Sequence, residues 1–316
     1  MCECSTAPED YTDPISSTVP RGKVLDALQA SDFGFFGAIW WPHASFEKLQ
    51  IATYLHVWLF TWDDEIDLND STMWNEFGAA QIYRDQTLAY VRYALGIDEA
   101  CPEVYNRIIL NFESIGAALK EAYTLDQRAR VYEAMRFFME MSEQEQRLRL
   151  SGAIPSVDEF WQHREGSSAV LVSLAVIEFS WDLTKLPLEF YADSDVRSLL
   201  RHTNTIISAS NDLLSIEKEI KRGAIDSLIP ITFFHVGDIQ IAVGDVVAFI
   251  TAEIRNLDNV AASLLRTYNG ADEEIRSQVS AFIDGCKYYC TGNLTWSLAT
   301  DRYGVKRVDG QVLITL

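Results

Sequence analysis

The chain has 316 residues, of which 48% are hydrophobic and 12% aromatic, so it is long and apolar enough to bury a sizeable core. Its net charge of −20 argues against nucleic acid as a partner, because phosphate backbones are bound by basic surfaces. Only 16 Gly and 8 Pro are present, too few for the frequent turns of an all-β protein.

Residues 1–20 are rich in Ser, Thr, Pro and acidic residues, which predicts a mobile N-terminal arm ahead of one domain over residues 21–316. The segment Met1–Thr12 is polar and acidic and so differs from a secretory signal. The five cysteines are an odd number, and we expect reduced thiols and a cytoplasmic location. No apolar run approaches the ~18 residues of a spanning helix, so no membrane insertion is expected.

From Arg21 onward, apolar residues recur with the period of an α-helix. Ser156, with Glu159 three residues later, has the pattern of a capping box at a helix start. We see no internal repeat and no interdomain linker, so the pattern favours one all-α bundle. The other expected helices, in chain order, are Glu47–Trp62, Trp74–Ala94, Ala100–Ala122, Asp126–Leu150, Val170–Ser180, Val196–Arg222, Ile239–Tyr268 and Asp272–Trp296.

The first acidic cluster, Asp63-Asp64-Glu65-Ile66-Asp67, follows the strongly apolar segment Tyr54–Trp62. On a helix, Asp63 and Asp67 share a face. Acids packed this closely repel one another unless a cation intervenes, and Mg²⁺ prefers such hard oxygen ligands. A solvated helix end is the alternative. The preceding apolar segment favours carboxylates at the rim of a pocket, because that segment is too apolar for the surface.

A second polar stripe consists of Asn211, Ser215 and Glu219, which stand four residues apart on one face of a predicted helix. Their amide, hydroxyl and carboxylate oxygens are all suitable ligands for one Mg²⁺. Asn and Ser are poor choices inside a helix, so their presence calls for a reason. Incidental spacing on a polar face is the alternative, and the first acidic cluster weighs against it.

Together, these segments resemble the motifs of class I terpene synthases, in the fungal and bacterial sesquiterpene cyclase branch. Asp63–Asp67 resembles the aspartate-rich motif DDxx(D/E), and Asn211–Glu219 resembles NDxxSxx(K/R)E with every specified position filled. Arg302-Tyr303 resembles the family's C-terminal Arg-Tyr pair. The resemblance spans roughly residues 20–305. Chain-elongating prenyltransferases share the first motif, but they carry a second Asp-rich motif where this chain has the Asn211 stripe.

The resemblance implies a single-domain helical bundle around a deep apolar active-site cavity, with three Mg²⁺ ions as cofactors. It implies that Asp63 bridges two metals, and that Asp67 assists them directly or through water. The third metal would be held by Asn211, Ser215 and Glu219. The diphosphate of the substrate would be contacted by Arg164, Lys218, Arg302 and Tyr303, and the catalytic set would be Asp63, Arg164, Arg302 and Tyr303.

Arg164 stands before Asn211 at nearly the spacing of the family's diphosphate-sensing arginine, with a surface arginine as the alternative. Ser168 corresponds to an effector residue near a helix break, which Gly166 and its serine neighbours would favour. Ser167 stands where bacterial members often have Asp, which departs from the family pattern.

A carbocation in the cavity would be stabilised by aromatic faces and shielded from water. His56, Leu59 and Phe60 lie within two helical turns before Asp63 and are the wall candidates, and Trp296 resembles a tryptophan common in the family. Ordinary core packing is the alternative for each aromatic residue.

The predicted function is therefore Mg²⁺-dependent ionisation of a linear prenyl diphosphate, farnesyl diphosphate first, and cyclisation to a sesquiterpene with release of diphosphate. The same chemistry on geranyl or geranylgeranyl diphosphate stays open, as does a non-catalytic isoprenoid-binding protein. A homodimer is also left open.

Overall fold

The computed structural model describes residue 26 and residues 28–67, 71, 73–187, 189–222, 226–308 and 311–313. The predicted arm over residues 1–20 lies outside the described residues. The helices, in chain order, are α2 (Phe33–Trp40), α3 (Phe46–Asp67), α4 (Phe77–Ala94), α5 (Arg107–Leu110), α6 (Glu113–Ala122), α7 (Leu125–Ser151), α8 (Val157–Ser167), α9 (Val170–Ala175), α10 (Ile177–Ser180), η2 (Phe190–Ala192), α11 (Ser194–Arg222), α12 (Leu228–Val236), α13 (Ile239–Thr267), η3 (Tyr268–Gly270) and α14 (Glu273–Ala299). The strands β1 (Lys306–Val308) and β2 (Gln311–Leu313) pair antiparallel near the C-terminal end.

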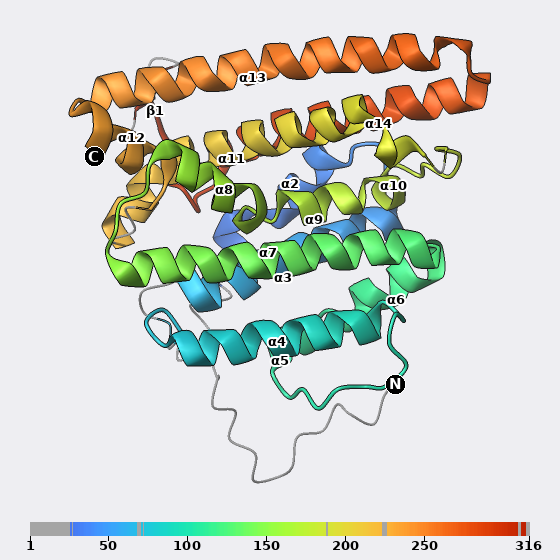
Figure 1. The fold of residues 1–316 in the computed structure, drawn as a ribbon, viewed down its shortest axis with the longest axis horizontal. Helices are drawn as coiled ribbons and strands as arrows, with labels where there is room; N and C mark the ends of the chain where they lie inside the picture. The colour runs from blue at the N-terminus through green and yellow to red at the C-terminus, as the bar shows by residue number, and fades with distance from the viewer. Residues whose placement is uncertain are drawn as a thin grey trace.

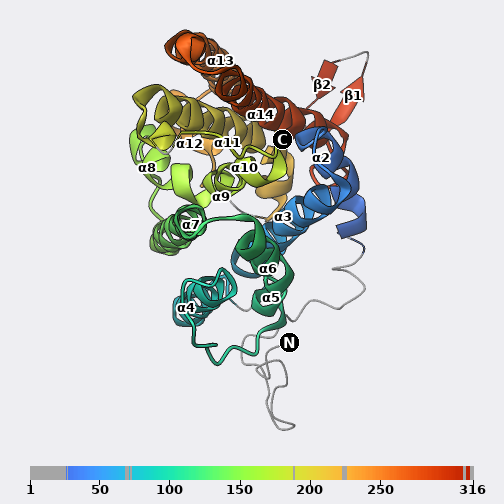
Figure 2. The ribbon, with the colours of Figure 1, turned by 90° about the vertical axis from the view of Figure 1, so that its right-hand side faces the viewer.

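The long helices lie roughly side by side, so the expected all-α fold is confirmed (Figure 1). α11 packs against α13 and α14, and α7 packs against α8 and α4. Figure 2 looks nearly along these helices and shows α3 in the interior, between α2 and α6. α3 contributes Trp62 to an apolar cluster with α4, α6 and α7, and Ala52 to a second cluster with α2, α11 and α14. α3 therefore carries its acidic end out of the centre of the protein.

Two of the expected helices are wrong in their extent. Residues 101–106 are not helical, because Pro102 lacks an N–H and Asn106 caps α5 by accepting hydrogen bonds from the amides of Ile108 and Ile109. The expected helix over Val170–Ser180 breaks at Val176 into α9 and α10. The capping box of Ser156 and Glu159 is confirmed. The short helices α2 and α12 were not expected from the apolar pattern.

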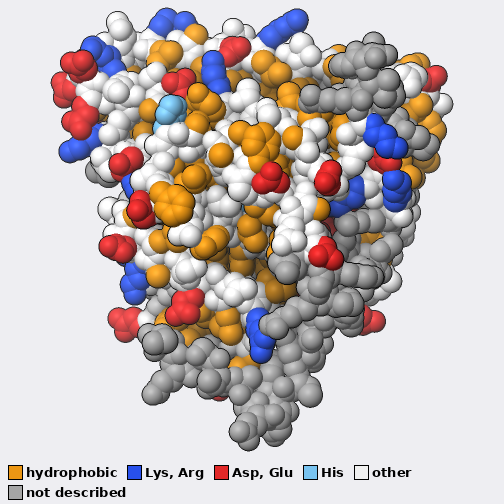
Figure 3. Space-filling view, turned by 180° about the vertical axis from the view of Figure 1, so that it is seen from behind, with side chains coloured by type: hydrophobic (Ala, Val, Ile, Leu, Met, Phe, Trp, Pro, Cys, Tyr) orange, Lys and Arg blue, Asp and Glu red, His pale blue; other side chains and the backbone are white. Residues whose placement is uncertain are grey.

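Acidic side chains are spread among apolar ones on the face opposite to that of Figure 1 (Figure 3). None of the described helices is long and apolar enough to cross a membrane. A net charge of −20 does not by itself favour binding of an anion. Binding of an anionic ligand therefore requires positive groups, either metal ions or basic side chains, that are gathered at one site.

Candidate active site

One cavity brings together the segments that the sequence singled out. It opens at the acidic end of α3, and its walls come from α2, α3, α7, α8, α9, α11 and the segment after α14. Thirteen of the fourteen residues predicted for the site line this cavity: His56, Leu59, Phe60, Asp63, Asp67, Arg164, Ser168, Asn211, Ser215, Lys218, Glu219, Arg302 and Tyr303. The packing of the helices therefore brings predicted site residues that are far apart in the sequence into one cavity.

Asp63 lies in the last turns of α3, where the helix leaves the core. Burial raises the pKa of its carboxyl well above the usual range, and repulsion from Asp67 and Asp64 raises it further. Asp64 and Asp67 line the same mouth. The end of α3 therefore concentrates negative charge in a poorly solvated place, which a bound cation would relieve.

Asp64, the acid next to Asp63 at this helix end, is already paired with an arginine. The guanidinium of Arg302 donates two hydrogen bonds to Asp64, with Nη1–Oδ2 at 3.2 Å and Nη2–Oδ1 at 3.0 Å. The carbon atom at the centre of the same guanidinium lies 4.8 Å from the ring centroid of Phe60. Arg302 is thus anchored at the mouth by a bidentate ion pair and an aromatic face.

The stripe on α11 faces the same mouth. Ser215 Oγ donates a hydrogen bond to the Asn211 carbonyl oxygen at 2.8 Å and also hydrogen-bonds the carboxylate of Glu219. Glu219 Oε2 is buried without a hydrogen-bond partner among the described residues, and burial raises the pKa of this carboxyl to about 7. Hard oxygen donors at successive turns, one of them an orphaned buried carboxylate oxygen, fit a divalent cation such as Mg²⁺.

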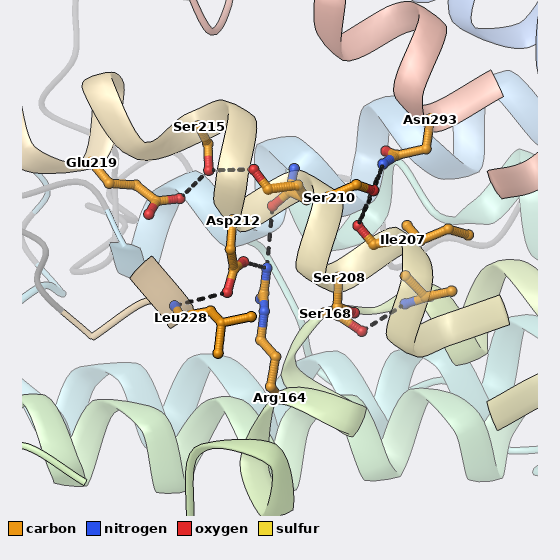
Figure 4. Close-up of polar contacts among 12 residues, drawn as sticks. Arg164, Ser168, Ile207, Ser208, Ser210, Asp212, Ser215, Glu219, Leu228 and Asn293 are labelled. Carbon is orange, nitrogen blue, oxygen red and sulfur yellow. Dashed lines mark hydrogen bonds and ion pairs between the residues drawn. The ribbon is translucent and has the colours of Figure 1, made fainter. Parts of the chain in front are cut away.

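Arg164 reaches from α8 to α11, as Figure 4 shows. Its Nη2 donates to Asp212 Oδ1 at 2.5 Å and to Asn211 Oδ1 at 3.1 Å. Asp212 is almost fully buried, and its other oxygen accepts from the amide of Leu228 at 3.1 Å. Arg164 therefore links the start of the α11 stripe to α8 through a buried ion pair.

Tyr303 and Lys218 complete the basic and polar side of the mouth. The Asn211 amide nitrogen donates to the Tyr303 hydroxyl at 2.7 Å, and Lys218 Nζ lies 5.8 Å from the centroid of the Tyr303 ring. Burial raises the pKa of Tyr303, so its hydroxyl stays protonated. The Arg-Tyr pair thus contacts both polar segments, because Arg302 binds Asp64 of α3 and Tyr303 binds Asn211 of α11.

Three further charged residues line the mouth that sequence reasoning missed: Glu145, Arg149 and Asp226. Arg149 Nη1 lies 3.1 Å from Asp67 Oδ1 and 4.0 Å from Asp226 Oδ2. Burial raises the pKa of Glu145 to about 8. Glu145 and Arg149 stand four residues apart on α7, within a helix that carries many exposed charges, so nothing in the local sequence marks them as site residues.

The deep wall of the cavity is apolar and aromatic. Phe60 and Leu59 line it, and so does His56, whose buried ring lies against Phe36 and Trp40 with centroids 5.0 and 5.3 Å away. Ser168 lines it where α8 ends, next to Ala169, whose φ of 57° breaks the helix. The predicted break is therefore present one residue beyond Ser168.

Trp296 is a correction, because it is not among the described residues that line the cavity. Its fully buried ring lies behind Phe60, with the centroids 5.6 Å apart, and its Nε1 donates to the Ser31 carbonyl at 2.6 Å. The segments before α3 hold the indole one layer away from the cavity. Trp296 supports the aromatic wall from outside.

No three His, Cys, Asp or Glu side chains of the described residues form a preassembled metal cage. Mg²⁺ is commonly bound by one or two carboxylates together with water and substrate phosphate. One oxygen of Glu219 has no hydrogen-bond partner among the described residues, and the buried carboxyl of Asp63 is crowded by other acids. The residues present therefore fit Mg²⁺.

Comparison with known proteins agrees with this geometry. Residues 54–256 match the family model described as terpene synthase family 2, C-terminal metal binding. A curated relative, the sesquiterpene cyclase hepA of Aspergillus oryzae, is 34% identical over 96% of this chain and 85% of its own length. The pristinol synthase of Streptomyces pristinaespiralis is 26% identical over 86% of this chain and 74% of its own length.

Solved structures resemble the fold at low sequence identity. An a-eudesmol synthase superposes with a TM-score of 0.77 at 18% identity, covering 89% of each chain. The germacradien-4-ol synthase of Streptomyces citricolor gives a TM-score of 0.75 at 18% identity, covering 89% of this chain and 87% of its own. With a matching family model over most of the chain, a relative of 34% identity and this shared fold, the chain belongs to the terpene synthase family.

Proposed function

We propose that this terpene cyclase ionises farnesyl diphosphate in a reaction that depends on three Mg²⁺ ions, and cyclises the cation to a sesquiterpene. One observation carries the proposal. The α11 stripe and the acidic end of α3 face one cavity mouth, and Arg164, Arg302 and Tyr303 are interleaved between them. Acidic and basic side chains thus lie together at the mouth of an apolar cavity. This arrangement suits a ligand with a metal-bound anionic head and an apolar tail.

The residues assigned to metal binding are Asp63 and Asp67 on α3, and Asn211, Ser215 and Glu219 on α11. When bound, Mg²⁺ supplies charge neutralisation to the diphosphate and so makes it a better leaving group. Asp67 Oδ1 is paired with Arg149 in this structure, so a metal bound by Asp67 would share this carboxylate with the arginine.

The basic groups have a separate task. Arg164, Lys218, Arg302 and the neutral hydroxyl of Tyr303 can donate hydrogen bonds to the phosphate oxygens. Arg164 and Arg302 are already oriented by Asp212 and Asp64. Donors that are preorganised in a poorly solvated site stabilise developing charge without a reorganisation cost.

The cavity wall protects the cation that is left behind. His56, Leu59 and Phe60 on α3, with Phe36 and Trp40 on α2, surround the space below the mouth. Ring faces attract a cation by up to roughly 2 kcal/mol each when desolvated. An apolar wall also excludes water that would trap the cation early.

Farnesyl diphosphate is proposed as the substrate because two of the curated relatives have names that state a sesquiterpene product, and sesquiterpenes are formed from the farnesyl chain. The test is incubation with geranyl, farnesyl and geranylgeranyl diphosphate, each with Mg²⁺ or with EDTA. Diphosphate release and volatile products are measured together. We expect a cyclic sesquiterpene from the farnesyl substrate, and none in EDTA.

The other outcomes are equally clear. Cyclic products from the geranyl or geranylgeranyl substrate alone would overturn the chain length. Equal turnover in EDTA would overturn the metal dependence. Binding of all three diphosphates without release of diphosphate would favour the non-catalytic isoprenoid-binding alternative.

A further inference from the structure

Deep in the cavity, His56 and Ser173 form a hydrogen-bonded pair that the ionisation step does not use. His56 Nε2 lies 2.7 Å from Ser173 Oγ, and both residues line the cavity. Both are almost fully buried. His56 precedes Asp63 by two turns of α3, which is roughly 10 Å at 1.5 Å per residue. The pair therefore lies away from the diphosphate end of the site.

The hydrogen-bond partners determine which ring nitrogen carries the proton. His56 Nδ1 lies 2.8 Å from the carbonyl oxygen of Ala52, which can only accept a hydrogen bond. Nδ1 must therefore carry the hydrogen, and in the neutral ring Nε2 is the basic nitrogen. The Ser173 hydroxyl then donates to Nε2, which leaves lone pairs on its oxygen. Burial lowers the pKa of His56 to about 4, so the ring is neutral near pH 7.

Two of the other cavity serines lack such a partner. Ser168 and Ser208 line the cavity, but both hydroxyls donate to the amide oxygen of Asn204, at 2.9 and 3.1 Å. An amide oxygen is a much weaker base than an imidazole nitrogen. Ser173 is distinguished from both because its hydroxyl proton can move to a basic nitrogen.

The geometry points to Ser173 and His56 as the proton acceptor that ends the cyclisation, an inference that rests on the proposed function. A C–H bond next to the last cationic carbon breaks, and its electron pair becomes the second bond of a new alkene. The proton goes to Ser173 Oγ, while the hydroxyl proton of Ser173 moves to His56 Nε2. The result is a neutral olefin, an intact serine and an imidazolium.

The surroundings of His56 suit this short-lived charge. The rings of Phe36, Trp40 and Trp41 have centroids 4.8 to 5.3 Å from that of His56, within the range of cation–π attraction. A carbocation is such a strong acid that a weak base suffices to deprotonate it. The low pKa of the buried ring then makes it release the proton readily to water when the product leaves.

The test compares the products that four variants of the enzyme form from farnesyl diphosphate. Ser173→Ala removes the relay, Ser173→Thr keeps a hydroxyl, and His56→Gln keeps a polar group that cannot take the proton. Ser180→Ala is the matched control, because Ser180 is also buried and bonded to Tyr289, and it is not among the described residues that line the cavity. Diphosphate release is recorded in every sample.

A lost general base slows proton transfer by about 10²–10⁴-fold, so the cation should be diverted to other products. We expect Ser173→Ala to release diphosphate but to lose the main olefin, and His56→Gln to lose the same olefin from its product mixture, while Ser173→Thr and Ser180→Ala keep it. An unchanged product mixture in Ser173→Ala would overturn the inference. Absence of diphosphate release from the wild-type enzyme would instead remove the proposed function.

A second measurement does not depend on turnover. In ¹⁵N-histidine NMR, the signals of His56 are those that disappear in His56→Gln. They should show a protonated Nδ1 and an unprotonated Nε2 at pH 7, with an Nε2 shift that changes in Ser173→Ala. A protonated Nε2 would overturn the inference, because that nitrogen could then accept no proton from Ser173.

Discussion

Asp64 and Arg302 form a two-point ion pair, with nitrogen–oxygen distances of 3.0 and 3.2 Å between residues 238 positions apart. The environment of the adjacent Asp63 differs, because burial and then the neighbouring acids Asp67 and Asp64 raise the pKa of its carboxyl. Two neighbouring carboxylates on α3 therefore differ in what they require. Asp64 is already paired with a guanidinium, and we therefore expect Asp63 to be the principal metal ligand.

Asparagine at these two positions should separate their roles. We expect Asp63→Asn to lower kcat by about 10²–10³-fold, as for other losses of electrostatic stabilisation in a site. Asp64→Asn should cost only about 10–100-fold, as expected for a residue that orients another group. Steady-state kinetics over a Mg²⁺ titration measures both. A larger loss in Asp64→Asn would contradict the assignment of Asp63 as the principal ligand.

The Arg164–Asp212 pair makes a stability prediction. Arg164→Leu strands a buried carboxylate, which costs about 3–5 kcal/mol of unfolding free energy. The double variant Arg164→Leu/Asp212→Asn should regain most of that loss, because Asn is neutral and still accepts from the Leu228 amide. Urea unfolding measures both. Turnover should remain low in both variants, since the arginine is absent. Equal stability of the single and double variants would show that the buried charge is not the cause.

Metal binding should raise the thermal stability of the native protein. A ligand at 100 times its Kd contributes about 2.7 kcal/mol when it binds only the folded state. We expect Mg²⁺ with diphosphate to raise Tm by several degrees, and Glu219→Gln to abolish most of that rise. Glu217→Gln is the control, since Glu217 lies on the same helix but pairs with Lys221 instead. Equal shifts in both variants, by differential scanning fluorimetry, would remove Glu219 from the metal site.

His56 predicts a pH dependence with a defined sign. Its pKa is about 4 in the folded protein and 6.5 as a reference for the unfolded chain, so the unfolded state binds more protons between these values. Its contribution to stability is fully present above pH 6.5 and is lost as the pH falls toward 4. At about 1.4 kcal/mol per pKa unit, wild type should lose about 3 kcal/mol more than His56→Gln over that range. Parallel unfolding curves for the two proteins would contradict this.

α8 packs so closely against α7 at Gly166 that a side chain at this position should destabilise the protein. A Cβ there would lie 2.3 Å from Met141 Cγ and 2.9 Å from Phe137 Cε1. Gly166→Ala is therefore expected to cost about 1–3 kcal/mol through overpacking, and to weaken diphosphate binding because Arg164 shifts. Gly244→Ala is the control, because it lies in α13 with open space around it and should stabilise by up to about 1 kcal/mol. Equal effects of both substitutions on unfolding would contradict this packing.

The sequence by itself determined the features that depend on helix geometry alone. Asp63 and Asp67 share a face, and Asn211, Ser215 and Glu219 form one stripe, because side chains three or four residues apart lie on the same side of a helix. The capping box at Ser156 is equally local. Helical periodicity along the chain indicated the all-α fold, and the resemblance of the two motifs to those of class I terpene synthases indicated the chemistry.

Only the tertiary structure decided what those faces meet. Glu145 and Arg149 join the mouth because α7 passes beside α3, and Trp296 is displaced behind Phe60 because the chain around Ser31 occupies the space next to it. His56 and Ser173 are 117 residues apart, and nothing in their local sequence pairs them. Spacing along one helix is fixed by covalent geometry, whereas contact between helices is fixed by side-chain packing across the whole core.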